Sequence, residues 1–207
     1  MTHSRSGLHA ASRRFDAALR QTVPAMLLRA GLSSDPEHPP LRVERAPTAT
    51  APTQMATLQS RDAATRAQLE TLYATCLKTY RESIRPQDTE DDDAGAAVAL
   101  FISANLHVLH DEQATPDMFE ALELQLRGVT RRSAEWDAAS HVQRQAFFER
   151  IAILAVLMAG SLDRAKSEGP AALADLRRTA RQYLQQMLGF NPDLLTIGPT
   201  GLVMRGR

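Results

Sequence analysis

Apolar residues in the last two thirds of the chain recur every three or four positions, the spacing of a helix with one buried face. The first stripe, over residues 61–83 and ending at Ile84, consists of Leu69, Leu72, Tyr73, Cys76, Leu77, Tyr80 and Ile84. Further stripes cover residues 92–111, residues 115–131, residues 140 to the Gly169-Pro170 break, and residues 170–188. The pattern predicts an all-α fold with a five-helix, bundle-like body whose helices are joined by short loops.

Residues at the ends of these stripes are of the types that begin and end helices. Ser60, Thr115 and Ser140 each precede a stripe, where their hydroxyl groups can accept from free backbone N–H groups. Gln143 is placed to complete a capping box with Ser140, and Gly189 fits the end of the last helix. The tail beyond Gly189 has no helical spacing, so we expect an extended segment or a short hairpin there.

The first third of the chain has a different character. Residues 8–28 have helical spacing with one apolar stripe, although Pro24 interrupts it. The next stretch favours an extended chain because it contains Pro36, Pro39, Pro40, Pro47 and Pro52. We therefore predict an amphipathic arm (residues 1–32), a Pro-rich linker (33–59) and a helical domain (60–207).

Charge is unevenly distributed between these parts. The whole chain is neutral, with 24 Lys+Arg against 24 Asp+Glu. Residues 1–60 contain seven Arg and four acids, a net charge of +3, and residues 61–207 contain 17 Lys+Arg and 20 acids, a net charge of −3. A nucleic-acid-binding role is disfavoured because no excess of positive charge is present overall.

The basic arm is the first candidate for partner binding, through Arg13, Arg14, Phe15 and Arg20. Three interpretations stay open: the arm docks on its own acidic body, inserts into the groove of a partner protein, or lies on an anionic membrane.

A second basic group, Arg177, Arg178 and Arg181, lies on the last predicted helix. It is either a solvated face or a surface for an acidic partner. No aromatic residues accompany these arginines as they would in a site for single-stranded nucleic acid.

Two polar features interrupt the predicted core. The acidic run 88–93 precedes a helix, and carboxylates there satisfy free N–H groups and oppose the positive end of the helix dipole. Asn105 falls on the apolar face of that helix, so its amide must find partners when buried. Either it bonds to a neighbouring backbone or it contacts a ligand in a crevice.

His107 and His110 are the best candidates for a metal site, because they share a helix face and Asp111 follows. A zinc site needs a third ligand, and the Glu-x-x-His pairs of helical di-iron proteins do not occur in the chain. We expect no metal and no cofactor, with a small-ligand crevice near Asn105, His107 and His110 as the alternative.

Compartment and membrane signals are weak. Cys76 is the single cysteine, so no internal disulfide can form. The longest apolar run, residues 151–160, is shorter than the roughly 20 residues that a membrane-spanning helix needs. The basic N-terminus lacks the uninterrupted apolar stretch of a signal peptide. We therefore expect a cytoplasmic protein without a transmembrane segment, with export through a non-standard or removed leader as the open alternative.

Several short motifs resemble a group of uncharacterised, mostly proteobacterial, all-helical domains of unknown function. The similarity covers about residues 65–203, and it implies a helical fold and, in many members, export. No catalytic residue follows from it. The motifs are Phe101-Ile102-Ser103-Ala104-Asn105, Gln125-Leu126-Arg127, Phe148-Glu149-Arg150-Ile151-Ala152, Leu188-Gly189-Phe190-Asn191-Pro192-Asp193-Leu194-Leu195 and Thr200-Gly201-Leu202.

Taken together, these features predict a non-enzymatic bacterial interaction protein of the adaptor, chaperone or immunity type. A protein partner would bind the helical body and the basic arm, and pairing of two copies of the chain is left open. The alternative is a small-ligand- or metal-binding protein or an enzyme.

Overall fold

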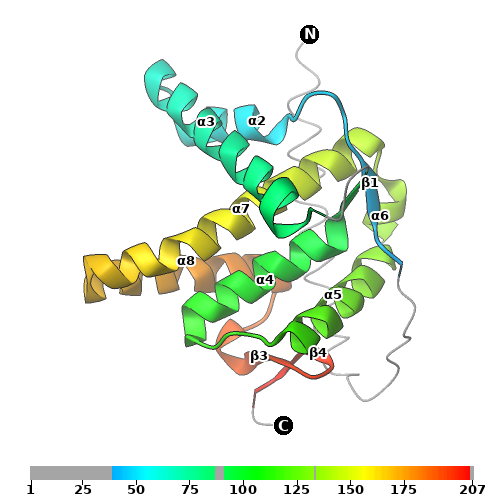
Figure 1. Cartoon of the computed structure of the whole chain (residues 1–207), viewed down its shortest axis with the longest axis vertical. Coiled ribbons are helices and arrows are strands. Elements are labelled where there is room, and N and C mark those ends of the chain that lie inside the picture. The colour runs from blue at the N-terminus through cyan, green and yellow to red at the C-terminus, as the bar shows by residue number, and fades with distance from the viewer. Residues whose placement is uncertain (1–38, 87–90, 133, 206–207) are drawn as a thin grey trace.

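The computed structural model describes residues 39–86, 91–132 and 134–205, which form a mostly helical fold with two small antiparallel sheets (Figure 1). The helices pack together, which confirms the predicted all-α class. The described elements in chain order are β1 (Arg42–Glu44), α2 (Ala51–Gln59), α3 (Ala63–Thr79), a π-helical turn (Tyr80–Ile84), β2 (Asp91–Asp93), α4 (Ala94–His110), α5 (Pro116–Arg131), α6 (Ala134–Ala138), α7 (His141–Glu168), α8 (Pro170–Leu188), a 3-10 turn (Pro192–Leu194), β3 (Leu195–Gly198) and β4 (Gly201–Met204).

Helix α4 lies at the centre of the fold and packs against α5, α7 and α8 (Figure 1). The face predicted to be apolar, with Phe101 and Ile102, is buried. The rest of the helix is also mostly buried, because alanines such as Ala97 and Ala99 let neighbouring helices approach closely. One amphipathic face was expected, and the structure shows a core helix covered on nearly all sides.

Helix α7 contains the apolar run of residues 151–160 and extends far beyond it, to 28 residues. It is the one helix among the described residues that is long and apolar enough to cross a membrane, by length and composition alone. A core helix meets the same criteria, and 56% of the apolar window of α7 is buried inside the fold. Packing against α3, α4 and α8 accounts for this apolar character.

The capping signals were correct at three boundaries and wrong at one. Thr115 accepts a hydrogen bond from the Met118 amide at 3.3 Å, and Ser140 forms the predicted capping box. Gly189 closes α8 in the left-handed conformation. Helix α3, however, is capped by Asp62 rather than by Ser60, because Asp62 lies nearer the first turn and accepts from the Thr65 amide at 2.7 Å. The predicted boundary was therefore two residues early.

The predicted linker differs from the structure over its described part, residues 39–59. This segment forms β1, which pairs with β2, and helix α2, which packs against α3 and α7. Leu41 and Val43 are buried in the main core. Pro52 does not prevent the helix, because proline is tolerated in the first turn, where its missing N–H has no helical partner. The arm of residues 1–32 and residues 33–38 lie outside the described residues.

The C-terminal tail forms the short hairpin that was one of its two predicted forms. Strands β3 and β4 pair from Leu195 opposite Met204 to Gly198 opposite Gly201. Gln125 of α5 holds the hairpin from the side: its Oε1 accepts from the Leu202 amide at 2.7 Å, and its Nε2 donates to the Leu202 carbonyl at 3.2 Å. The amide side chain thus replaces a neighbouring strand at the edge of β4.

Candidate functional site

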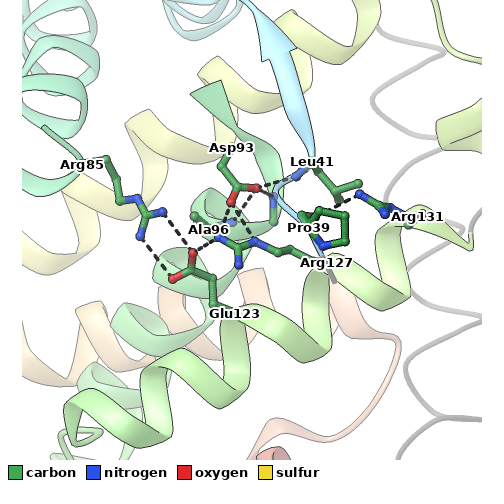
Figure 2. A network of polar contacts seen from close by, with 9 residues as sticks. Pro39, Leu41, Arg85, Asp93, Ala96, Glu123, Arg127 and Arg131 are labelled. Carbon is green, nitrogen blue, oxygen red and sulfur yellow. Dashed lines mark hydrogen bonds and ion pairs between the residues drawn. The ribbon is translucent and has the colours of Figure 1, made fainter. Parts of the chain in front are cut away.

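Asp93, at the N-terminus of α4, accepts hydrogen bonds from several segments of the chain (Figure 2). Its Oδ1 accepts from the backbone amides of Gly95 at 2.9 Å and Ala96 at 3.4 Å, which caps the helix. The same atom accepts from the Leu41 amide at 3.1 Å. One buried carboxylate therefore begins the central helix and fixes the chain that leads into β1.

The second oxygen of Asp93 is bound by Arg127 of α5, through Nε at 2.8 Å and Nη2 at 2.5 Å. Arg127 Nη2 also pairs with Glu123 one turn earlier on α5. Arg85, just after the π-helical turn, binds both oxygens of Glu123 at 3.1 and 3.2 Å. Opposite charges thus alternate from Asp93 to Arg85, as Figure 2 shows.

The contact between Arg127 and α4 depends on a glycine. A Cβ atom at Gly95 would overlap the Cγ atom of Arg127 and crowd its backbone. The arginine stem therefore lies directly on the first turn of α4.

Asp92 forms a second centre on the other side of the strand. It is 1% exposed and accepts from Arg81 Nη2 at 2.6 Å and from Arg45 Nε at 2.8 Å. The Arg81 guanidinium also lies over the Phe148 ring, 5.7 Å from its centroid. Asp92 therefore joins β2 to the π-helical turn and to the segment after β1.

Glu149, fully buried on α7, is the third centre. Its Oε2 accepts from the backbone amides of Thr50 at 2.9 Å and Ala51 at 3.0 Å, at the start of α2. Its Oε1 accepts from Gln145 Nε2 at 2.7 Å and lies 3.8 Å from Arg81 Nη2. Since Thr50 makes no side-chain cap, a carboxylate from another helix caps α2.

These groups form a carboxylate–arginine network of two clusters, one around Asp93 and Glu123 and one around Asp92 and Glu149. The clusters meet at the consecutive residues Asp92 and Asp93 of β2 and connect elements far apart in the sequence. Buried charges are costly unless they are paired, and removing one partner of a buried pair typically costs about 3–5 kcal/mol. The network therefore determines how the N-terminal segment, α4, α5 and α7 fit together. Its members are Asp92, Asp93, Glu123 and Glu149 with Arg45, Arg81, Arg85 and Arg127.

Burial raises the pKa of the Glu123 carboxyl, although Arg85 and Arg127 oppose this shift and Asp93 adds to it. A raised carboxyl pKa is one property of a catalytic acid or base. Here, however, both oxygens of Glu123 face arginines of the network, so its geometry is that of a structural ion pair.

The profile of a family of unknown function matches residues 13–205, which is nearly the whole chain. The chain belongs to the DUF6683 family. No curated protein and no solved structure gives a match.

Motif residues of this DUF6683 protein carry several of its anchoring contacts. Arg127 binds Asp93, Glu149 caps α2, and Gln125 holds the C-terminal hairpin. These polar roles were not predicted from the sequence. A charged or amide residue inside an otherwise apolar stripe was the available signal, as Glu149 between Phe148 and Ile151 illustrates.

Asn105 is fully buried in this DUF6683 protein and bonds within its own helix. Its Nδ2 donates to the Phe101 carbonyl at 2.7 Å, and its Oδ1 has no hydrogen-bond partner among the described residues. The expected bond to a neighbouring helix or loop is replaced by a bond to the preceding turn.

His107 and His110 are not brought together with Asn105. His107 Nε2 lies 4.0 Å from Asp111 Oδ1 on the outer side of α4. His110 contacts the C-terminal tail: Arg205 donates to its Nδ1 at 2.8 Å, and its Nε2 lies 3.3 Å from the Pro192 carbonyl. Within the described ranges, no three His, Cys, Asp or Glu side chains are grouped as metal ligands.

The arginines of α8 have separate partners within the chain. Arg177 Nε donates to the Val108 carbonyl at 3.3 Å, near the C-terminus of α4. Arg178 pairs with Asp175 at 2.9 Å, and Arg181 pairs with Asp193 at 2.9 Å. The arm candidates lie outside the described residues, namely Arg13, Arg14, Phe15 and Arg20.

Cys76 is buried among apolar residues, as its position on the α3 stripe predicted. Burial raises the pKa of its thiol, which favours the protonated and unreactive form.

Proposed function

We propose that this DUF6683 protein is a non-enzymatic interaction module of a bacterium, of the adaptor, chaperone or immunity type. The helical body and the basic N-terminal arm bind a partner protein. The observation that carries the proposal is a projection formed by the last residues of α2 and the first half of α3, which extends away from the rest of the body (Figure 1).

The exposed half of α3 is unusual for a helix of a compact domain. Of residues 63–72, eight are exposed and none is buried. Leu72 there is 45% exposed, and Leu58 near the end of α2 is 64% exposed. Leucines on projecting helices are suitable anchors for the apolar groove of a partner.

The base of this projection is firmly attached. Glu149 holds the start of α2 on α7, and Thr53 Oγ1 donates to Glu70 Oε1 at 2.7 Å, which connects α2 to α3. A projection with a fixed base loses less conformational entropy when it binds than a free segment would.

The alternative, a ligand or metal crevice at Asn105, His107 and His110, has less support. Asn105 is buried in the core, His107 faces Asp111, and His110 contacts the C-terminal tail. The three side chains have separate surroundings, so the geometry favours the interaction role.

Affinity purification of the full-length protein from its native bacterium tests the proposal. We expect Leu58→Asp and Leu72→Asp to reduce the recovered partner at least tenfold, because a charge in an apolar groove opposes binding. Val142→Asp on α7 is the matched control, since Val142 is 56% exposed and lies outside the projection. Equal recovery with all three variants, or no specific partner, would contradict the proposal.

The role of the arm is tested separately on the full chain. Arg13→Glu combined with Arg14→Glu should lower recovery and weaken its dependence on salt, because two positive charges are reversed. Arg164→Glu, at an arginine whose side chain is 73% exposed on α7, should leave recovery unchanged. Loss of recovery in Arg164→Glu as well would point to net charge rather than to the arm.

A further inference from the structure

An open pocket lies beside the carboxylate–arginine network, between the segment after β1 and one face of α3 and the π-helical turn. Its volume of about 600 Å³ falls within the range of roughly 300–1,000 Å³ typical of small-molecule sites. Leu77 and Ala74 belong to its apolar part, and Arg45, Lys78, Arg81 and Glu82 are its charged residues.

Among the described residues of this lining are three cations and one carboxylate, and the buried Asp92 behind the pocket pairs with two of the cations, Arg45 and Arg81. The carboxylate, Glu82, lies 3.8 Å from Lys78 Nζ, which is beyond hydrogen-bond distance, and both side chains are largely exposed. Such an exposed pair contributes little to stability. Lys78 is therefore available to a stronger anion.

The two arginines of the pocket are held in place by a buried group. Arg45 and Arg81 both bind Asp92, and their side chains are only 26% and 21% exposed. Arg81 uses Nε and Nη2 for its contacts, and its Nη1 has no acceptor among the described residues. A guanidinium oriented in advance binds a carboxylate or phosphate with less loss of entropy than a mobile one.

We propose that this pocket binds a small organic anion. Its carboxylate or phosphate group contacts Arg81, Arg45 and Lys78, and its apolar part lies over Leu77 and Ala74. This site is separate from the exposed leucines of the projection, so it does not depend on the proposed interaction role.

The two lysines of the chain, Lys78 and Lys166, provide an internal comparison. Lys166 lies outside the pocket, where it pairs with Asp111 at 2.8 Å. The full-length protein is acylated with an amine-reactive ester in the presence of millimolar benzoate, hexanoate, citrate or inorganic phosphate, with chloride at matched ionic strength as reference. Mass spectrometry then measures modification at each lysine.

We expect at least one organic anion to slow the acylation of Lys78 at least threefold and to leave Lys166 unchanged. Inorganic phosphate should protect less than the best organic anion, because it has no apolar part. No protection in the whole panel, or equal protection of both lysines, would overturn the proposal.

A variant that fills the pocket makes the test specific. Ala74→Phe places a ring in the cavity and should abolish the protection of Lys78. Ala67→Phe, at another exposed alanine of α3 outside the pocket, should leave it intact. Melting curves of both variants establish that they are folded. Protection that persists in folded Ala74→Phe would also overturn the proposal.

Discussion

At the start of α4, a glycine and an arginine depend on each other. Arg127 reaches Asp93 because Gly95 leaves room for its stem. Alanine is normally the better helix former by about 1 kcal/mol. Glycine at position 95 therefore lowers the intrinsic helix propensity of α4 but makes room for the contact between Arg127 and Asp93.

Replacing Gly95 with alanine should therefore destabilise the protein by about 1–3 kcal/mol, the usual cost of overpacking. Gly160→Ala on α7 is the matched control, because a Cβ there meets nothing within 4 Å. It should stabilise by about 0.5–1 kcal/mol. Urea unfolding measures both changes, and the same sign for the two variants would contradict the explanation.

Glu123 predicts a pH dependence of stability. Its pKa in the folded protein is raised above the ordinary value of 4.5 by burial. Between these two values the folded state binds more protons than the unfolded state, so this carboxyl lowers stability as pH rises through the window.

In the variant Glu123→Gln, position 123 no longer titrates, so it contributes no pH dependence to the free energy of unfolding. The stability of the wild type relative to Glu123→Gln should therefore be greatest at or below pH 4.5 and should fall as pH rises. Urea unfolding at a series of pH values measures the difference. Glu120→Gln, at an exposed position of the same helix, controls for the loss of one charge. Identical slopes for Glu123→Gln and the wild type would refute this assignment.

At the scale of elements, α2 depends on Glu149 of α7 for its N-terminal cap. Glu149→Gln replaces a carboxylate that accepts from two amides, and hydrogen bonds to charged groups contribute roughly 1.5–3 kcal/mol. We expect a loss of that size and faster amide hydrogen exchange in residues 51–59. Glu70→Gln, at the exposed contact with Thr53, should change stability by less than about 0.5 kcal/mol. If amide hydrogen exchange in α2 is the same in Glu149→Gln and the wild type, the carboxylate of Glu149 does not stabilise this helix.

The long helices could be predicted because their signals are local. The stripe of α5 and the capping box of Ser140 and Gln143 depend on residues three or four positions apart. Strand β1 and helix α2 were missed because their stability comes from distant partners. Leu41 is tied to Asp93 across 52 residues, and no short window of sequence contains both.

The candidate site was harder to predict than the fold. The acidic run was correctly interpreted as helix-start chemistry for Asp93, but Asp92 binds Arg45 and Arg81 instead of the helix. Alternation along β2 explains the difference, since neighbouring residues of a strand point to opposite sides. The arginine partners come from other elements and carry no signal in the local sequence.

At the scale of the whole molecule, the described segment 39–59 is part of the body. Leu41 and Val43 are buried in the main core, and burying such a side chain contributes about 1.5–3 kcal/mol. Without this segment, Asp92 loses Arg45, and Glu149 loses the amides of α2.

Truncation tests this statement. Residues 39–207 should melt cooperatively, and residues 60–207 should melt roughly 10–20 °C below that fragment, since each kcal/mol shifts Tm by about 2–4 °C. Circular dichroism measures both. Equal melting temperatures for the two fragments would restore the predicted boundary at residue 60.

Because Glu149 caps α2, this helix is synthesised before the residue that caps it. Ala51 and its acceptor are separated by 98 residues. At about 5–20 residues per second, the ribosome delivers Glu149 roughly 5–20 s after Ala51. Helix α2 must therefore wait without its cap, and with Leu58 accessible, while roughly half of the chain is synthesised. A cell that makes this protein has to tolerate or shield that nascent segment before the native contact can form.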